Sequence, residues 1–148
     1  MQTTLILIKP DAIQRGLSGE ILSRIERKGL KITALKMIRV TPDLARKHYA
    51  EHLEKPFYPA LEQYITSSPV IALVAAGPDA VSVIRLMVGP TSGLLAPAGT
   101  IRGDFSTSNR LNLIHASDSE KSAEREIAVF FNPSEILDYS FTIAEWLG

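Results

Sequence analysis

Residues 70–76 limit the possible folds of this chain more than any other segment. They read Val-Ile-Ala-Leu-Val-Ala-Ala, without a polar side chain on either face of the strand that they would form. A strand that is apolar on both faces needs cover on both faces, so it belongs near the centre of its sheet. The segment therefore predicts a layered protein in which helices pack against a sheet.

Shorter patterns predict the elements around this strand. Further strands are expected at residues 4–8, 31–40 and 111–116, and helices at 19–28, 41–53, 60–65, 79–88 and 120–131. Lys9-Pro10-Asp11 predicts a turn and residues 89–103 a long structured loop. The tail after Pro133 carries apolar side chains that we expect to be buried, at Ile136, Leu137, Phe141 and Trp146. This order of elements permits either an α/β or an α+β sandwich.

Composition favours one domain, residues 1–148, with a cytoplasmic location. The chain has 16 basic and 16 acidic residues and a net charge of zero, which does not favour nucleic acid as a partner. No apolar run is long enough to cross a bilayer, and the N-terminus lacks the basic start of a secretory signal. Without cysteine, disulfides and thiolate metal sites are excluded.

His115 is the most prominent candidate for chemistry. It follows an apolar stretch, so we expect it at a junction between a strand and a helix, held firmly but open to solvent. Ser117, with Glu120 three residues later, fits a capping box that would open that helix. A neutral imidazole is a usable nucleophile near pH 7, although a lone histidine is more often an ordinary surface or capping residue.

Three cations elsewhere would complete a phosphate site beside this histidine. Lys9, Arg85 and Arg102 each follow an apolar element or lie in a loop, and each alone would be an ordinary surface charge. Together they would bind phosphate oxygens, with neutral hydrogen bonds from Thr91 and Asn112. The chain has no G-x-x-x-x-G-K-[ST] pattern, so it is not a P-loop protein.

Two short motifs suggest other functions. Residues 48–52 match H-x-x-E-H, an inverted zinc-protease pattern whose two histidines would share a helix face. No third ligand follows on a later helix, so an exposed or half-buried helix face is the better interpretation. The adhesion tripeptide at residues 102–104 has no secretion signal and is interpreted as coincidence.

Several blocks of residues match one known family in order and spacing. They are residues 7–11, 14–16, 48–49, 55–57, 85, 99–105, 112–119 and 122–127. On these blocks the chain resembles the nucleoside diphosphate kinases over essentially its whole length. The resemblance implies an α+β fold, a ferredoxin-like sandwich with a four-stranded antiparallel sheet covered by helices. It also implies γ-phosphate transfer from a nucleoside triphosphate, usually ATP, to a nucleoside diphosphate.

Roles for individual residues are carried over from the family. The histidine matching His115 would take the phosphate covalently and pass it on, in ping-pong kinetics. Glu126 would orient this ring through its far nitrogen, Ser117 would contact Glu126 or the leaving oxygen, and Tyr49 would close the site. The expected nucleotide contacts are Lys9, Arg85, Arg102 and Thr91 on the phosphates, Asn112 on the sugar and Phe57 on the base. Asp118 would help to hold Mg²⁺ through water.

Three departures from the family pattern stand out. Ala12 replaces a common glycine, the loop at residues 90–98 is unusually apolar, and Asn109 replaces an aliphatic residue opposite Phe57. None of them changes His115, Lys9, Arg102 or Asn112, although the altered loop contains Thr91. The family also works as tetramers or hexamers, which implies a homo-oligomer. A non-catalytic scaffold or nucleotide-binding protein of the same fold is the alternative function.

Overall fold

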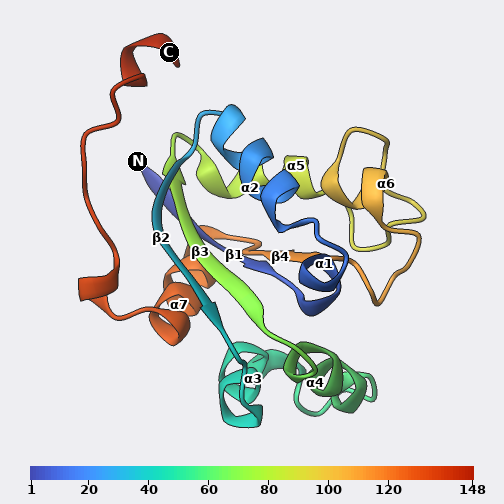
Figure 1. Cartoon of the computed structure of the whole chain (residues 1–148). Coiled ribbons are helices and arrows are strands. Elements are labelled where there is room, and N and C mark those ends of the chain that lie inside the picture. Colours follow the sequence, from blue (N-terminus) through green and yellow to red (C-terminus); the bar gives the residue numbers. More distant parts are fainter.

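Four antiparallel strands form a sheet in the order β2-β3-β1-β4 at the centre of the structure, a computed structural model that describes residues 1–148 (Figure 1). The strands are β1 (Gln2–Ile8), β2 (Lys31–Ile38), β3 (Val70–Gly77) and β4 (Ile114–Ala116). Every residue of β3 is buried, and β3 lies between β1 and β2. The central position predicted for residues 70–76 is therefore confirmed.

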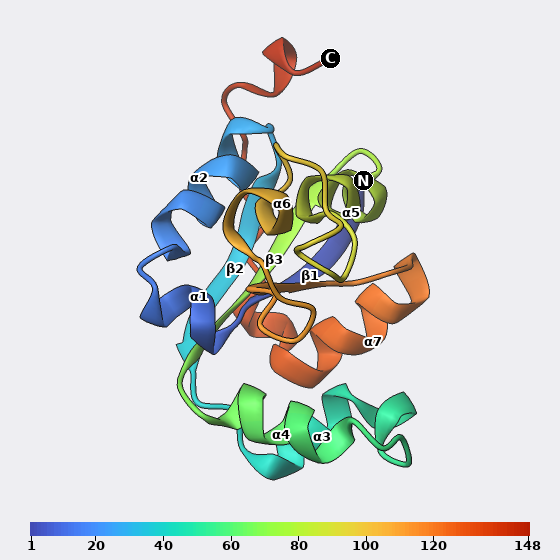
Figure 2. The ribbon, with the colours of Figure 1, turned by 90° about the vertical axis from the view of Figure 1, so that its right-hand side faces the viewer.

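Helices cover both faces of this sheet (Figures 1 and 2). One face carries α2 (Ser18–Arg27) and α5 (Ala80–Val88), and the other carries α3 (Pro42–His48), α4 (Tyr58–Thr66) and α7 (Glu120–Phe130). The remaining helical elements are α1 (Pro10–Gln14), η1 (Ala50–His52), α6 (Ile101–Phe105), η2 (Pro133–Glu135) and η3 (Ala144–Trp146). The fold is the expected α+β, ferredoxin-like sandwich, which excludes the α/β alternative.

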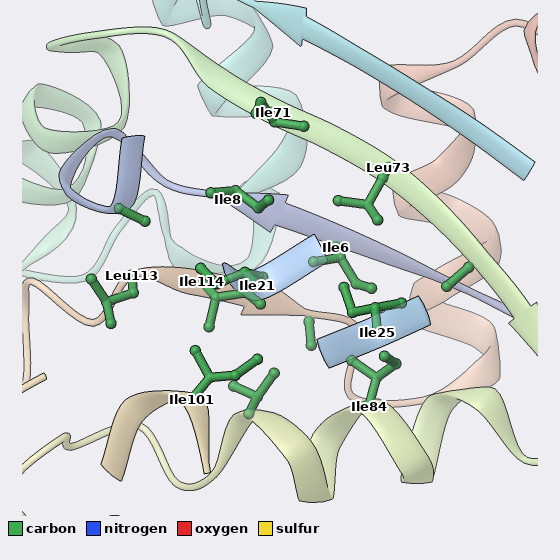
Figure 3. Packing of buried hydrophobic residues seen from close by; sticks show 14 of the residues in the cluster. Ile6, Ile8, Ile21, Ile25, Ile71, Leu73, Ile84, Ile101, Leu113 and Ile114 are labelled. Atoms are coloured by element: carbon green, nitrogen blue, oxygen red, sulfur yellow. The ribbon is translucent and has the colours of Figure 1, made fainter. Parts of the chain in front are cut away.

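Alternating side chains of β1 supply the two halves of the core. Ile6 and Ile8 enter a cluster with Ile21, Ile25 and Ile84 from α2 and α5 (Figure 3). The alternate residues Leu5 and Leu7 enter a second cluster with Phe130 of α7 and side chains of α3 and α4. The period of two along a strand therefore fixes which helices each β1 side chain contacts.

Local signals explain several helix boundaries. Thr41 caps α3 by accepting a hydrogen bond from the Leu44 N–H, as the Thr41-Pro42 pair predicts. Gly29 and Gly89 end α2 and α5 with φ of 97° and 87°, a conformation that favours glycine. The turn predicted at Lys9-Pro10-Asp11 is wrong, because Pro10 is the first residue of the short helix α1.

Two expected elements are shorter than their patterns. The helix predicted at 41–53 ends at His48 and continues after Tyr49 only as the 3-10 turn η1. The strand predicted at 111–116 begins at Ile114, because Leu113 has a positive φ of 73° and cannot join a ladder there. The loop predicted at 89–103 contains the start of α6.

The C-terminal tail differs from expectation. It extends along and away from the sheet (Figure 1), and Leu137 and Trp146 are 62% and 80% exposed. Of the four apolar residues, only Ile136 and Phe141 are partly buried, so the prediction of a buried tail is wrong for the isolated chain. Separately, every helix of this structure is too short or too polar to cross a bilayer.

Candidate active site

A cavity of about 670 Å³ opens beside β4, α7, α3 and the loop before α6. Ten of the eleven residues predicted for the site line it, namely Lys9, Tyr49, Phe57, Arg85, Thr91, Arg102, Asn112, His115, Asp118 and Glu126. The eleventh, Ser117, lies behind the wall and contacts Glu126. The fold thus brings together residues separated by more than one hundred positions in the sequence.

The register of β4 decides where His115 points. His115 pairs with Leu7 of β1, and directly opposed residues of antiparallel strands point to the same face. Its imidazole therefore lies on the face that carries α3 and α7. His115 is the middle residue of β4, so the expected junction between a strand and a helix is wrong by a few residues.

Glu126 and Ser117 hold one side of the His115 ring. Glu126 lies on the buried stripe of α7 with Ala123 and Phe130, at helical spacing. Its Oε1 lies 2.7 Å from His115 Nε2 and accepts a 2.9 Å hydrogen bond from the Ser117 hydroxyl. A carboxylate at Nε2 favours the tautomer that carries its proton there, so Nδ1 keeps its lone pair.

Burial keeps this imidazole neutral. The desolvation of His115 lowers its pKa below the usual 6.5, and Glu126 opposes the shift only in part. Lys9 and Arg102 lower the pKa further through their positive charges. Near pH 7 the ring is therefore uncharged, which is the form that can act as a nucleophile.

His48 is a site residue that the sequence did not identify. Its ring meets the His115 ring edge-on, with centroids 4.6 Å apart, and is only 4% exposed. Burial lowers the pKa of His48 well below 6.5, so a second neutral imidazole packs against the first. The sequence marked His48 by the H-x-x-E-H pattern, which suggested a different role, and by the matching block at residues 48–49, to which no role was given for His48.

That zinc pattern does not form a shared face. The helix ends at His48, and His52 lies beyond the break with its Nδ1 2.9 Å from the Lys55 ammonium. His48 is buried rather than exposed or half-buried, which corrects that interpretation as well. The nearest potential ligands are instead His48, His115 and Glu126, whose ligand atoms lie within 4.8 Å of one another.

Lys9 and Asn112 form a buried polar pair on the cavity wall. The Lys9 ammonium donates a 2.8 Å hydrogen bond to Asn112 Oδ1, and the Asn112 amide donates to the Thr91 carbonyl at 3.1 Å. Burial, together with the charge of Arg102, lowers the pKa of Lys9 to about 7. Two of the three ammonium donors remain for a ligand anion, whose charge would offset this desolvation.

Arg102 is fixed by backbone carbonyls on three sides. It donates to the Asn112, Gly89 and Ile114 carbonyls at 3.2, 3.1 and 2.6 Å, and it is 4% exposed. A guanidinium has five N–H groups, so three such bonds leave two for an anion. Arg85 is more exposed and donates to the Ala116 carbonyl at 3.3 Å. The cavity therefore combines one buried guanidinium held by three hydrogen bonds and one exposed guanidinium held by one.

Asp118 and Ser119 define the start of α7. Ser119, rather than Ser117, caps the helix by accepting from the Ser122 N–H at 3.0 Å, so the expected capping box is wrong. Hydroxyls of Ser122 and Ser119 hold the pKa of Asp118 below its usual value. Asp118 is thus an ionised, exposed carboxylate at the cavity rim, an oxygen donor of the type that Mg²⁺ accepts.

Aromatic side chains form the outer part of the cavity. Phe57 is 52% exposed and lies between the 3-10 turn η1 and α4. Tyr49 is buried with a hydroxyl that has no hydrogen-bond partner, and it lines the cavity next to His48. Asn109, one of the departures from the family pattern, also lines the cavity. An exposed ring beside a cationic cavity suits a ligand that has both a base and phosphates.

A neutral imidazole, clustered cations and an exposed ring together describe a phosphotransferase that acts on nucleotides. Comparisons with known proteins narrow this class. The family model described as nucleoside diphosphate kinase matches residues 2–136. A nucleoside diphosphate kinase of Rhodopirellula baltica is 54% identical over 147 residues, 99% of this chain and 97% of that protein. One of Staphylothermus marinus is 55% identical over 138 residues, 93% of this chain and 98% of that protein.

Solved structures agree with the sequence relatives. A nucleoside diphosphate kinase of Halobacterium salinarum, solved in complex with CDP, superposes with a TM-score of 0.98 at 44% identity, covering 99% of this chain and 98% of that one. A family protein from Babesia bovis gives 0.97 at 42% identity, with all of both chains covered. The chain belongs to the nucleoside diphosphate kinase family and is an enzyme of that class.

Proposed function

We propose that this chain transfers the γ-phosphate of a nucleoside triphosphate to a nucleoside diphosphate through a covalent phosphate on Nδ1 of His115. The observation that carries the proposal is the hydrogen bond between Glu126 and Nε2 of the same ring at 2.7 Å. It assigns the proton to Nε2 and leaves Nδ1 as the nitrogen with a free lone pair. Neutral His115 then needs no base to become a nucleophile.

In the first half-reaction a bond forms between Nδ1 and the γ-phosphorus while the bond from that phosphorus to the β-phosphate oxygen breaks. The nucleoside diphosphate leaves, and the proton stays on Nε2 beside Glu126. In the second half-reaction a terminal oxygen of another nucleoside diphosphate attacks the same phosphorus and restores Nδ1. Each half-reaction uses the same cavity, so the sequence of events is ping-pong.

The cations of the cavity are proposed to position the phosphates. Phosphoryl transfer depends on in-line geometry and on neutralising the oxygens, more than on proton transfer. Lys9 and Arg102 are held by protein contacts before any ligand binds, so little reorganisation is needed. Arg85, which is more exposed, would close on the bound phosphates together with Thr91.

The family uses a divalent metal, and we assign Mg²⁺ to the phosphate end of the cavity. The ionised Asp118 carboxylate fits a hard cation that keeps several waters and shares phosphate oxygens with one or two carboxylates. When bound, Mg²⁺ would neutralise charge on the transferred phosphate. Imidazoles such as His48 suit it poorly as ligands.

The base and sugar are proposed to be held loosely. Phe57 offers a stacking face that every base can use, and Asn112 offers its amide to the sugar. Binding by stacking alone discriminates little between bases, so broad nucleoside specificity is expected. Residues 1–148 are proposed to form one domain that assembles as a homo-oligomer, either a tetramer or a hexamer, and a cytoplasmic location stays a prediction.

Steady-state kinetics test this function. With ATP as donor and GDP as acceptor, double-reciprocal plots at several GDP concentrations should be parallel, and His115→Gln should abolish turnover while ATP still binds. Intersecting lines would contradict the covalent route. ATP binding without turnover by the unaltered chain would instead favour the non-catalytic scaffold function.

A further inference from the structure

A strained turn lies directly beside the phosphate-binding residues. Leu113 has φ of 73°, and the Ile114 N–H donates to the Asn112 carbonyl at 2.8 Å, two residues back. This is a γ-turn with a positive central φ, a rare and unfavourable conformation. A leucine has no local hydrogen bond to offset that cost and is less suited to it than glycine or asparagine. Something outside the turn must therefore stabilise it.

Asp11 and Tyr64 provide this support from the other side of the site. The Leu113 N–H donates to Asp11 Oδ2 at 3.1 Å, and the Tyr64 hydroxyl donates to the other oxygen of the same carboxylate. The Leu113 carbonyl accepts from the Lys9 N–H at 2.8 Å. The N–H of Leu113 is thus held by Asp11 of α1, and its carbonyl is held by Lys9, the residue before α1.

Both rigid phosphate-binding cations depend on the residues that flank this turn. Lys9 Nζ donates to Asn112 Oδ1, and Arg102 Nε donates to the Asn112 carbonyl. Arg102 also donates to the Ile114 carbonyl on the other side of Leu113. If Leu113 relaxed to a negative φ, the flanking peptide planes would rotate and both cations would lose their partners.

We propose that Asp11 and Tyr64 are positioning residues that hold the Leu113 turn and thereby keep Lys9, Asn112 and Arg102 arranged for phosphate. The proposal rests on the function of His115 proposed above. The aromatic ring of Tyr64 contributes a second contact, because the Lys9 ammonium lies 5.6 Å from its centroid. Tyr64 thus touches both ends of the arrangement, whereas Asp11 acts through Leu113 and also through its charge, which raises the pKa of Lys9.

The test compares matched variants in the rate of His115 phosphorylation at saturating ATP and Mg²⁺, at a pH below about 7 so that Lys9 stays protonated in each variant. Asp11→Ala removes the acceptor that holds the Leu113 turn, so the step should slow about tenfold or more as Lys9 and Arg102 lose their partners. Asp11→Asn should stay within about threefold of the parent rate, since its amide oxygen can still accept from Leu113 and its NH₂ can donate to Tyr64. Gln14→Ala is the control, because Gln14 joins α1 to Ser68 after α4 without touching the turn.

A second background separates positioning from general stability. In Lys9→Gln protein, Asp11→Ala should slow phosphorylation by less than about twofold, because the two residues act on one arrangement. The proposal would be overturned if the double variant slowed by the product of the two single slowing factors. An unchanged phosphorylation rate in Asp11→Ala would also overturn it. If Asp11→Ala fails to fold, Tyr64→Phe replaces it in the test. The phosphorylation rate of Tyr64→Phe should also fall, and an unchanged rate would contradict the proposal. Absence of phosphorylation in the parent chain would overturn the proposed function itself.

Discussion

Glu126 Oε1 lies 2.7 Å from Nε2 of His115, and the same oxygen accepts a hydrogen bond from the buried Ser117 hydroxyl. This arrangement fixes both the orientation and the tautomer of the imidazole. The carboxylate comes from α7 and the histidine from β4, and α7 packs directly on β1 beside that strand. The nitrogen that is proposed to react is therefore selected by how a helix packs on the sheet.

Replacing Glu126 by glutamine should slow phosphorylation of His115 by about tenfold to a hundredfold. The change removes a charge-assisted hydrogen bond, which is worth about 1.5–3 kcal/mol, and weakens the preference for the Nε2–H tautomer. Rapid-quench measurement with ATP gives the rate. Glu124→Gln, an exposed position on the same helix, is the matched control, and equal rates in both variants would remove Glu126 from this role.

The pH profile of kcat/KM should have two limbs set by opposite requirements. His115 must be neutral, and its pKa is lowered by burial, so the acidic limb should lie below pH 6.5. Lys9 must be protonated, and its pKa in the free enzyme is about 7, so activity should fall as the pH rises through that value. Bound phosphate raises the pKa of Lys9, so the limb of kcat should lie at higher pH.

Two variants check the assignment of these limbs. Lys9→Arg carries a permanent charge and should remove the alkaline limb, whatever its effect on the maximal rate. Glu126→Gln removes the group that raises the pKa of His115, so the acidic limb should move to lower pH. An alkaline limb that survives in Lys9→Arg would show that another group titrates there.

Phe57→Ala should weaken nucleotide binding by about fivefold to a hundredfold, because stacking on an aromatic ring is worth about 1–3 kcal/mol per base. The maximal rate should change little, since the proposed role of Phe57 is to stack on the base and not to contact the phosphates. Calorimetric measurement of ADP and CDP binding tests one purine and one pyrimidine nucleotide. Leu53→Ala is the control, being exposed and close in sequence but outside the cavity lining. Undiminished nucleotide affinity in Phe57→Ala would show that the base binds elsewhere in the cavity.

Asp118→Asn should raise the Mg²⁺ concentration that gives half-maximal activity, while the rate at saturating Mg²⁺ recovers in part. The amide keeps an oxygen but loses the charge that attracts the hydrated cation. Activity is titrated against Mg²⁺ at fixed ATP. Asp138→Asn changes an exposed carboxylate that pairs with Lys31 far from the cavity and should have no effect. Identical titrations for both variants would remove Asp118 from the metal site.

The sequence predicted the sheet because its strands are marked by apolar runs. Residues 70–76 show both faces of a central strand directly, and Thr41-Pro42 and Gly89 mark helix ends through local chemistry. The Pro10 helix was missed because it has only five residues and little periodicity. The exposure of Trp146 could not be predicted either, because an apolar residue does not show by itself whether other residues of the same chain will bury it.

The site was predictable where motifs carry the chemistry and unpredictable where tertiary contacts do. Ser117 and Ser119 look alike as caps in sequence, but only the fold directs Ser117 inward to Glu126. His48 becomes a neighbour of His115 only because α3 and β4 meet in space. The support from Asp11 to Leu113 joins positions 102 residues apart, a distance at which the sequence carries no local signal.

The most direct test of the covalent mechanism is incubation of the purified protein with γ-labelled ATP and Mg²⁺ without an acceptor. The mechanism predicts acid-labile, alkali-stable label on the chain that maps to His115 and leaves as labelled GTP when GDP is added. His115→Gln should take up no label under the same conditions. Turnover of ATP and GDP without any labelled protein, or label that stays on the chain after GDP is added, would contradict the phosphohistidine route.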